Sequence, residues 1–296
     1  MAEYVIFTDA GGDVPAELWT KYGLGSVPMS YLLSGETGLF DPDDPEREAC
    51  CAKFYDALRR RADVSTSQIT PFLFEKLFAP ELEAGRDVLY CGFSSGLSST
   101  WQNAQAVTEQ LKERFPQRTV RCVDSLSAAG GAGIFALQAA VNRERGMSLE
   151  ENAQWLEAHA SKMCHWFTVD DLDFLKRGGR LSPTVAFLGG KLQIKPLLVI
   201  LQDGKLKVVE KARGRKAAMQ RLVQMYQNAL DFGGAEPLVI VDHAGCPEEA
   251  EALAEQLRAV SPAGTQVLVT ELSPIIGAHT GPGALTVCHF GTGRMG

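Results

Sequence analysis

Short runs of Val, Ile and Leu alternate with longer stretches of helical pattern along most of the chain, and this alternation limits the possible folds more than any other feature. In the first half, strands are expected at residues 4–8, 88–93 and 120–124. The helices expected around them span residues 13–22, with Asp13 as N-cap and Pro15 in the first turn, then 100–115, 129–145 and 148–162. Such alternation is typical of a largely parallel sheet covered by helices.

The pattern changes in the second half of the chain. Two apolar runs, at residues 195–201 and 206–210, flank Asp203-Gly204, which indicates an antiparallel hairpin. Further helices are expected at 215–230 and 247–260, and further strands at 238–242, 267–271 and 285–290. Because 296 residues exceed what one hydrophobic core commonly fills, we expect an α/β protein of two α/β domains. The first, residues 1–155, has a mainly parallel sheet, and the second, residues 156–296, has a mixed sheet.

Composition excludes several classes of protein. The chain is 45% apolar and 22% charged, as in ordinary folded globular proteins. No apolar run approaches the roughly 20 residues that cross a bilayer, and the first residues lack the basic start of a signal peptide. We therefore expect a soluble, cytoplasmic chain without stable membrane insertion. A net charge of −7 argues against nucleic-acid binding, and seven scattered cysteines without a C-x-x-C pair predict reduced thiols and no metal site.

Positive charge is concentrated in one segment despite the negative total. Residues 171–221 contain 12 basic and 4 acidic side chains. A run of this kind is either a solvated face or a docking surface for an anion or an acidic partner.

A serine hydrolase active site is one interpretation of Gly-Phe-Ser-Ser-Gly at residues 92–96. The segment matches G-x-S-x-G and lies between an expected strand and an expected helix, where a nucleophile elbow would hold its serine. Ser94 or Ser95 would then be the nucleophile, with an acid such as Asp124 or Asp242 and the later His279 completing a triad.

An anion-binding loop is a second interpretation of the same segment. Residues 94–100 supply five hydroxyl groups at the start of a helix, where backbone N–H groups attract anions. The chain has no HGG-type segment to provide the second oxyanion donor of a hydrolase. A simple helix N-cap, the third interpretation, would explain only one or two of the hydroxyls.

Three other residues are candidates for an anion site. Thr66 belongs to a hydroxyl cluster at residues 64–68, expected to be a loop before a helix that starts near Pro71. His279 lies in a stretch rich in glycine, residues 277–283, expected to be a loop with unusual backbone angles. Arg180 lies in Lys-Arg-Gly-Gly-Arg-Leu-Ser-Pro, residues 176–183, which ends one helix and starts another.

A nucleotide cofactor is not expected. Residues 129–136 contain a G-x-G-x-x-A pattern, but it lies several residues after its strand, and no acidic residue follows at the required distance. Close packing of a helix on a sheet explains these glycines without a cofactor.

Taken together, these segments resemble the DegV family of bacterial lipid-binding proteins over almost the full length. The motifs that carry the resemblance are Thr8-Asp9 with Asp13-Val14-Pro15, Thr66-Ser67-Gln68, Phe93-Ser94-Ser95-Gly96-Leu97-Ser98, Val123-Asp124-Ser125, Asp170-Asp171-Leu172, Leu175-Lys176, Gly178-Gly179-Arg180, Lys195-Pro196, Asp203-Gly204-Lys205, Lys211-Ala212-Arg213-Gly214 and His279-Thr280-Gly281-Pro282-Gly283. Ala10 and Ser99 depart from the family pattern, which has serine and glycine at these places.

The resemblance implies that two α/β domains enclose one long-chain fatty acid. Its carboxylate would be held by Thr66, Ser95 or Ser94, and His279, with Arg180 nearby, and no cofactor other than this ligand would be needed. The resemblance further implies a binding protein that is not itself an enzyme. Such a protein presents the acid to a separate ATP-dependent fatty acid kinase, which forms an acyl phosphate for phospholipid metabolism.

Two other functions remain open beside this one. A serine esterase or thioesterase would use Ser94 or Ser95 with His279, and a lipid sensor would bind the acid without a kinase partner. On the kinase hypothesis, the basic segment at 171–221 flanks the mouth of the pocket and docks the kinase, and reversing the charges of Lys207, Arg213 and Arg215 together should impair phosphorylation.

Overall fold

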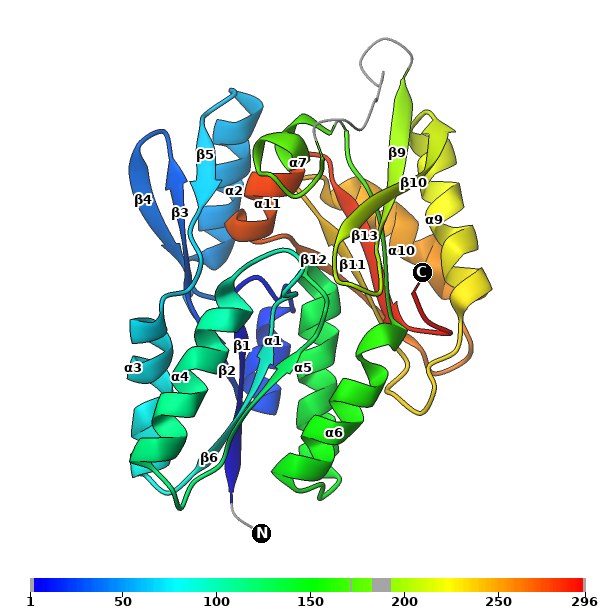
Figure 1. The fold of residues 1–296 in the computed structure, drawn as a ribbon. Coiled ribbons are helices and arrows are strands. Elements are labelled where there is room, and N and C mark those ends of the chain that lie inside the picture. The colour runs from blue at the N-terminus through cyan, green and yellow to red at the C-terminus, as the bar shows by residue number, and fades with distance from the viewer. Residues whose placement is uncertain (1–2, 171, 183–192, 295–296) are drawn as a thin grey trace.

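A computed structural model describes residues 3–170, 172–182 and 193–294 of the chain. The described strands form three sheets (Figure 1). The first is fully parallel, with the order β2-β1-β6-β7. Its strands are β1 (Tyr4–Asp9), β2 (Leu24–Val27), β6 (Asp87–Gly92) and β7 (Val120–Asp124). The predicted parallel sheet of the first half is therefore confirmed.

Helices cover both faces of this parallel sheet. Helices α3 (Pro71–Glu83) and α4 (Thr100–Arg114) pack together on one face, and α1 (Ala16–Tyr22), α5 (Ala129–Glu144) and α6 (Leu149–His159) cover the other. Local sequence explains where several of them begin. Thr70 caps α3 with Pro71 as its first residue, and Ser148 with Glu151 forms a capping box at the start of α6.

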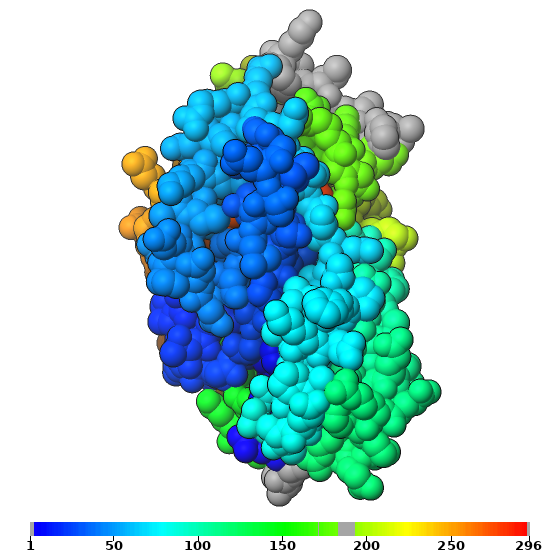
Figure 2. All heavy atoms as spheres, turned by 90° about the vertical axis from the view of Figure 1, so that its left-hand side faces the viewer, coloured from blue at the N-terminus to red at the C-terminus, as the bar shows by residue number. Residues whose placement is uncertain are grey.

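A small antiparallel sheet, which the strand pattern does not predict, is inserted in the first half. It consists of β3 (Met29–Leu33), β4 (Glu36–Phe40) and β5 (Val64–Thr66), in the order β4-β3-β5. Helix α2 (Arg47–Arg59) lies between β4 and β5 in the sequence. Figure 2 shows that early elements of the chain cover this side of the molecule. The sequence does not predict these strands because they are short and only partly buried, so they lack a clear alternation of apolar and polar residues.

The second half forms a six-stranded mixed sheet with the order β10-β9-β8-β13-β11-β12. The strands are β8 (Met163–Thr168), β9 (Ile194–Ile200), β10 (Leu206–Arg213), β11 (Leu238–His243), β12 (Gln266–Glu271) and β13 (Leu285–Phe290). Among the strands that the structure describes here, only β11 and β12 are parallel neighbours, and β9 with β10 forms the predicted hairpin. Helices α9 (Arg215–Ala229) and α10 (Pro247–Val260) cover the outer face of this sheet. The combination of parallel and antiparallel pairs confirms the predicted mixed sheet.

Helix α5 packs between the two larger sheets. It contacts β1 and β6 of the parallel sheet as well as β11 and β13 of the mixed sheet, which requires small residues on its surface. A Cβ on Gly130 would lie 2.6 Å from Ile240 Cγ2, and one on Gly133 would lie 2.3 Å from Val14 Cγ2. A Cβ on Gly131 would lie 2.4 Å from Ser127 Oγ. Close packing thus explains Gly131 and Gly133 of the G-x-G-x-x-A pattern as well as the adjacent Gly130.

The two halves are also joined by buried hydrogen bonds. Asp13 was predicted to cap the first helix, and this was wrong: α1 begins at Ala16 after Pro15, without a side-chain cap. Asp13 Oδ1 instead accepts a hydrogen bond from the backbone N–H of Ser273, 3.0 Å away in the second half. Tyr55 of α2 likewise donates to the carbonyl of Leu272 at 2.8 Å.

Two short helices lie between the small sheet and the mixed sheet. They are α7 (Asp173–Arg177) and α11 (Pro274–Thr280), which contact each other, and α11 also contacts α2, β3 and β5. A 3₁₀ turn, Ala160–Lys162, connects α6 to β8. The predicted domain boundary after residue 155 would fall within α6 and stays a prediction. None of the helices in the described ranges is long and apolar enough to cross a bilayer.

Candidate binding site

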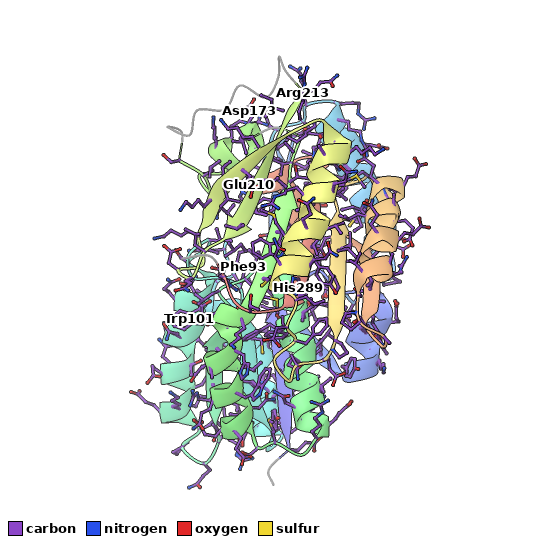
Figure 3. All side chains as sticks on the ribbon, turned by 90° about the vertical axis from the view of Figure 1, so that its right-hand side faces the viewer. Phe93, Trp101, Asp173, Glu210, Arg213 and His289 are labelled. Carbon is purple, nitrogen blue, oxygen red and sulfur yellow. The ribbon has the colours of Figure 1, made fainter. Side chains whose placement is uncertain are left out.

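An apolar pocket opens where the parallel sheet, the mixed sheet and α11 meet. It contains about 710 Å³ of space free of protein atoms, part of it open to solvent. Most of its lining is apolar and comes from both halves of the chain: Met29, Phe93, Leu97, Phe167, Leu175, Ile200, Leu206, Ile275 and Ile276. Figure 3 shows Phe93 at the level where the two halves meet.

Thr66 and His279 meet at one end of this pocket. The structure corrects the expected local structure of both residues. Thr66 ends strand β5 and pairs with Tyr31 of β3, and His279 lies in the last turn of helix α11, before the left-handed Gly281 and Gly283. Thr66 Oγ1 and His279 Nε2 are 2.8 Å apart, within hydrogen-bond distance.

His279 is neutral at physiological pH. Burial, followed by the positive charge of Arg180, lowers the pKa of its imidazole to about 4. Its Nδ1 is buried and has no hydrogen-bond partner among the described residues. The backbone of Gly178 lies against this nitrogen, since a Cβ on Gly178 would be only 2.3 Å from it.

Arg180 provides a positive charge beside the histidine. Its Nε donates to the carbonyl of Leu97 at 3.1 Å and its Nη1 to the carbonyl of Gly178 at 2.6 Å. These bonds hold the guanidinium in place but do not neutralise it. Among the residues that the structure describes, no carboxylate forms an ion pair with Arg180. Burial lowers the pKa of its side chain.

The three polar side chains form the boundary between two spaces. Thr66, Arg180 and His279 line the apolar pocket, and they also line a solvent-open depression with Asp63, Arg177 and other residues. A ligand with an anionic head and an apolar tail fits this arrangement, because its head can meet the cationic and neutral donors while its tail enters the pocket.

Ser94 and Ser95 lie outside the lining of the pocket. Ser94 is fully buried, and its Oγ donates to the carbonyl of Gly204 at 2.8 Å, which joins the end of β6 to the β9–β10 turn. Ser95 is half-buried, and its backbone N–H donates to Asp124 Oδ1 at 3.3 Å. Neither serine is hydrogen-bonded to His279 in the described structure, so it holds no serine–histidine pair of the kind that a hydrolase needs.

Several polar residues of the lining were not predicted. Ser67 and Gln68 follow Thr66 directly, Ser98 belongs to the hydroxyl run after β6, and His165 and Thr286 come from β8 and β13. Ser67, Gln68 and Ser98 belong to the two hydroxyl-rich segments, so the sequence does indicate their region. His165 and Thr286 carry no local motif, because only strand pairing brings them to the pocket.

The structure offers no arrangement for a metal ion within the described residues, where no group of three or more His, Cys, Asp or Glu side chains is suitably placed. All seven cysteines are free thiols.

The fold and the site together define a class of protein: a two-part α/β binding protein whose apolar pocket is lined in part by hydroxyl, imidazole and guanidinium groups. The profile of the DegV family, described as uncharacterised proteins, matches residues 3–291. The chain belongs to the DegV family.

Curated relatives agree with this assignment. A DegV domain-containing protein of Clostridium perfringens is 34% identical over 291 residues, covering 98% of each chain. One from Lactococcus lactis is 36% identical over 287 residues and covers 96% of each chain.

Solved structures include fatty-acid-binding members of the family. A DegV family protein of Thermus thermophilus, described by its fatty acid binding, is 29% identical, with a TM-score of 0.83 over 98% of this chain and all of that one. DegV of Bacillus subtilis, described as a fatty acid binding protein, is 27% identical, with a TM-score of 0.81 over 98% of this chain and 100% of its own. A DegV lipid binding protein of Thermotoga maritima gives 27% identity and a TM-score of 0.84, covering 99% of this chain and 100% of that one.

Proposed function

We propose that this protein binds one long-chain fatty acid in the apolar pocket and presents its carboxylate to a separate ATP-dependent fatty acid kinase. The observation that carries the proposal is the position of Arg180, a half-buried guanidinium without an ion pair to any described residue, beside neutral His279 and the hydroxyl of Thr66. A carboxylate placed there would supply the missing negative charge. The fatty-acid-binding relatives support the choice of ligand.

The acyl chain would provide most of the affinity. Burying about 14 methylene groups of a C16 chain at ~0.8 kcal/mol each gives roughly 11 kcal/mol before the costs of association. The head group therefore needs only moderate interactions to fix its position. Hydrogen bonds from neutral donors and one guanidinium can hold a carboxylate and leave an oxygen able to attack ATP.

The open depression beyond the polar residues supports delivery to a second protein. It shares Thr66, Arg180 and His279 with the apolar pocket, so a carboxylate bound there would be reached from outside while its chain stayed buried. A kinase that covered the depression would bring ATP to the carboxylate without removing the acid from its carrier. This function would place the protein in the cytoplasm, where ATP is available.

The proposed kinase-docking surface is on strand β10, at the edge of the mixed sheet. Lys207 and Arg213 of this strand are exposed, and exposed positive charges attract an acidic partner. Figure 3 shows Arg213 at the end of the molecule near α7, beside which the depression opens.

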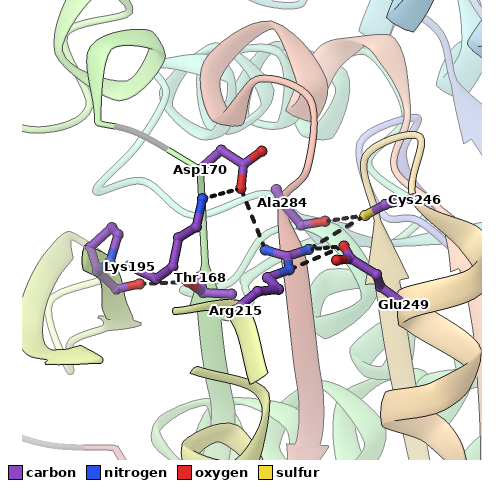
Figure 4. Close-up of polar contacts among 8 residues, drawn as sticks. Thr168, Asp170, Lys195, Arg215, Cys246, Glu249 and Ala284 are labelled. Carbon is purple, nitrogen blue, oxygen red and sulfur yellow. Dashed lines mark hydrogen bonds and ion pairs between the residues drawn. The ribbon is translucent and has the colours of Figure 1, made fainter. Parts of the chain in front are cut away.

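Arg215 has a different role from these two residues. It donates to Glu249 Oε2 at 2.8 Å and lies 3.9 Å from Asp170, which also binds Lys195 at 2.6 Å (Figure 4). Its side chain is only 16% exposed. Reversing its charge would disrupt this network, so the docking surface is tested with Lys207 and Arg213 alone.

The serine hydrolase alternative is less well supported by the geometry. The Ser94 hydroxyl donates to a backbone carbonyl, and the hydrogen-bond partner of His279 is Thr66. A lipid sensor without a kinase has the same pocket and differs only in its partner. Ser94 and Ser95 lie outside the lining of the pocket, so the proposed head-group ligands are Thr66, His279 and Arg180.

The experiment that tests this function combines the purified protein, palmitate, ATP and a bacterial fatty acid kinase catalytic subunit, with acyl phosphate trapped as the hydroxamate. Hydroxamate that forms only when both proteins are present supports the proposal. Bound palmitate without any acyl phosphate would favour the lipid sensor. Release of free acid from an ester, blocked in Ser94→Ala or Ser95→Ala, would favour the hydrolase.

A further inference from the structure

The wall that the mixed sheet contributes to the pocket also carries a polar side chain. His165 lines the pocket from strand β8, together with Phe167 on the same face of the strand. Unlike Thr66, Arg180 and His279, it does not line the solvent-open depression. His165 therefore belongs to the part of the pocket that an acyl tail would occupy when the head group lies at the three shared residues.

His165 has an unused hydrogen-bonding group. The residue is 5% exposed, and its Nδ1 is buried without a hydrogen-bond partner among the described residues. Burial, followed by the charge of Arg294, lowers the pKa of its imidazole to about 3, so the ring is neutral. A neutral imidazole has one nitrogen that donates and one that accepts a hydrogen bond.

The surroundings of His165 do not supply the missing partner. Its neighbour across the strand pair is Cys288, whose Sγ is 3.8 Å from Asp242 Oδ2. Thr286, which also lines the pocket, donates its hydroxyl to the same oxygen of Asp242. Both side chains thus face Asp242 and leave Nδ1 of His165 without a partner among the described residues.

We propose that the pocket is built for a fatty acid that carries a hydroxyl group along its chain, and that His165 binds this hydroxyl. This inference rests on the proposed fatty acid binding and specifies the class of acid. A plain saturated chain would leave the buried nitrogen without a partner, which is unfavourable. A hydroxyl group can either donate or accept, so it pairs with a neutral imidazole in both tautomers.

A charged group on the chain would fit this part of the pocket less well. Phe167, Ile200 and Leu206 line the pocket here and carry no charge. The guanidinium of Arg294, whose charge acts on His165, lies outside the lining and donates to backbone carbonyls. A buried ion on the acyl chain would therefore lack a partner, which is strongly unfavourable. The neutral hydroxyl is the group that satisfies His165 at the smallest desolvation cost.

The test measures the affinities of stearate and of its 10-, 12-, 18- and 2-hydroxy derivatives for the full-length, delipidated protein by displacement of a fluorescent fatty acid. The 2-hydroxy isomer is a control of equal composition, because its hydroxyl lies beside the carboxylate and cannot reach His165. At least one of the other three isomers is expected to bind about tenfold more tightly than stearate, since a buried polar group left unpaired costs about that factor or more.

Two variants assign the effect to the side chain. His165→Leu removes both nitrogens, so it is expected to tighten stearate binding and to remove the preference for the hydroxy acid. His165→Gln keeps a donor and an acceptor and is expected to retain part of the preference. The fluorescent acid reports in each titration whether the variant still has a working pocket.

The results separate this inference from the function on which it rests. Stearate and every hydroxy isomer binding with equal affinity, or a preference that persists in His165→Leu, would overturn the hydroxyl site and leave fatty acid binding intact. Failure of all these acids to bind the native protein would instead overturn the proposed function, and the hydroxyl site with it.

Discussion

Thr66 Oγ1 and His279 Nε2 lie 2.8 Å apart, although 213 residues separate them in the chain. The contact joins the small antiparallel sheet to helix α11, which precedes the last strand of the mixed sheet. This hydrogen bond is one of those that connect the two halves of the molecule, and it lies beside the apolar pocket.

Replacing Thr66 by valine tests the hydroxyl at this contact. Valine keeps the shape of the side chain but cannot donate to a carboxylate or pair with His279, so fatty acid affinity should fall roughly tenfold, as expected for one buried hydrogen bond. Affinity is measured by displacement of a fluorescent fatty acid. Ser65→Ala, at the exposed neighbouring position, is the matched control and should bind like the native protein. Equal affinities for the two variants would remove Thr66 from the site.

Gly178→Ala tests the position of His279 without changing any polar group. Gly178 has helical backbone angles (φ −70°, ψ −8°) that alanine adopts readily, but the new methyl group would lie 2.3 Å from His279 Nδ1. The ring must move, so fatty acid affinity should fall at least fivefold with little change in melting temperature. Lys176→Ala in the preceding helix is the control. An alanine variant with native affinity would show that the position of His279 does not matter for binding.

The pKa of His279 predicts how stability depends on pH. This pKa is about 4 in the folded protein and about 6.5 in the unfolded chain, so the unfolded state binds more protons between these values. The neutral His279 therefore contributes to stability above pH 6.5, and this contribution is lost as the pH falls toward 4. The loss in unfolding free energy is of order 3 kcal/mol, at ~1.4 kcal/mol per pKa unit.

Urea unfolding of the native protein and of His279→Gln, between pH 4.5 and 7.5, measures this contribution. His165 and His289 are also buried with lowered pKa values, so the difference between the two proteins isolates His279. The native protein should lose more stability than the variant as pH decreases. A difference in unfolding free energy that stays constant with pH would contradict a neutral His279.

Reversing two charges on β10 tests kinase docking. Lys207→Glu with Arg213→Glu should lower the rate of acyl phosphate formation at least tenfold at low ionic strength, because charge complementarity controls association. Fatty acid affinity should not change. Lys53→Glu with Lys76→Glu, exposed positions on α2 and α3, is the control with the same change in net charge. Similar rates for the two double variants would return the basic segment to the role of a solvated face.

Much of the fold was predictable because strong local signals mark its regular elements. Strands β6 and β11 are fully buried and consist mainly of apolar residues, and Asp203-Gly204 marks the β9–β10 turn. The small sheet, and the position of Thr66 in one of its strands, could not be predicted in this way, because β5 has only three residues and is held by its pairing with β3.

The candidate site shows the same division between local and long-range information. Thr66, Arg180 and His279 were found because hydroxyl-rich and glycine-rich segments and a family resemblance marked them, and the structure brings all three together. Ser94 lies in the most conspicuous motif, yet it hydrogen-bonds to Gly204 across the two halves. His165 became visible only through strand pairing, which places it against Cys288.

Mass spectrometry of the lipid that co-purifies with the protein tests whether the pocket binds a fatty acid. We expect denaturing extraction of the freshly purified protein to release close to one long-chain fatty acid per chain, and Thr66→Val to release less. A preparation that contains no fatty acid, and that takes up neither palmitate, oleate nor a hydroxystearate when these are added, would contradict fatty acid binding.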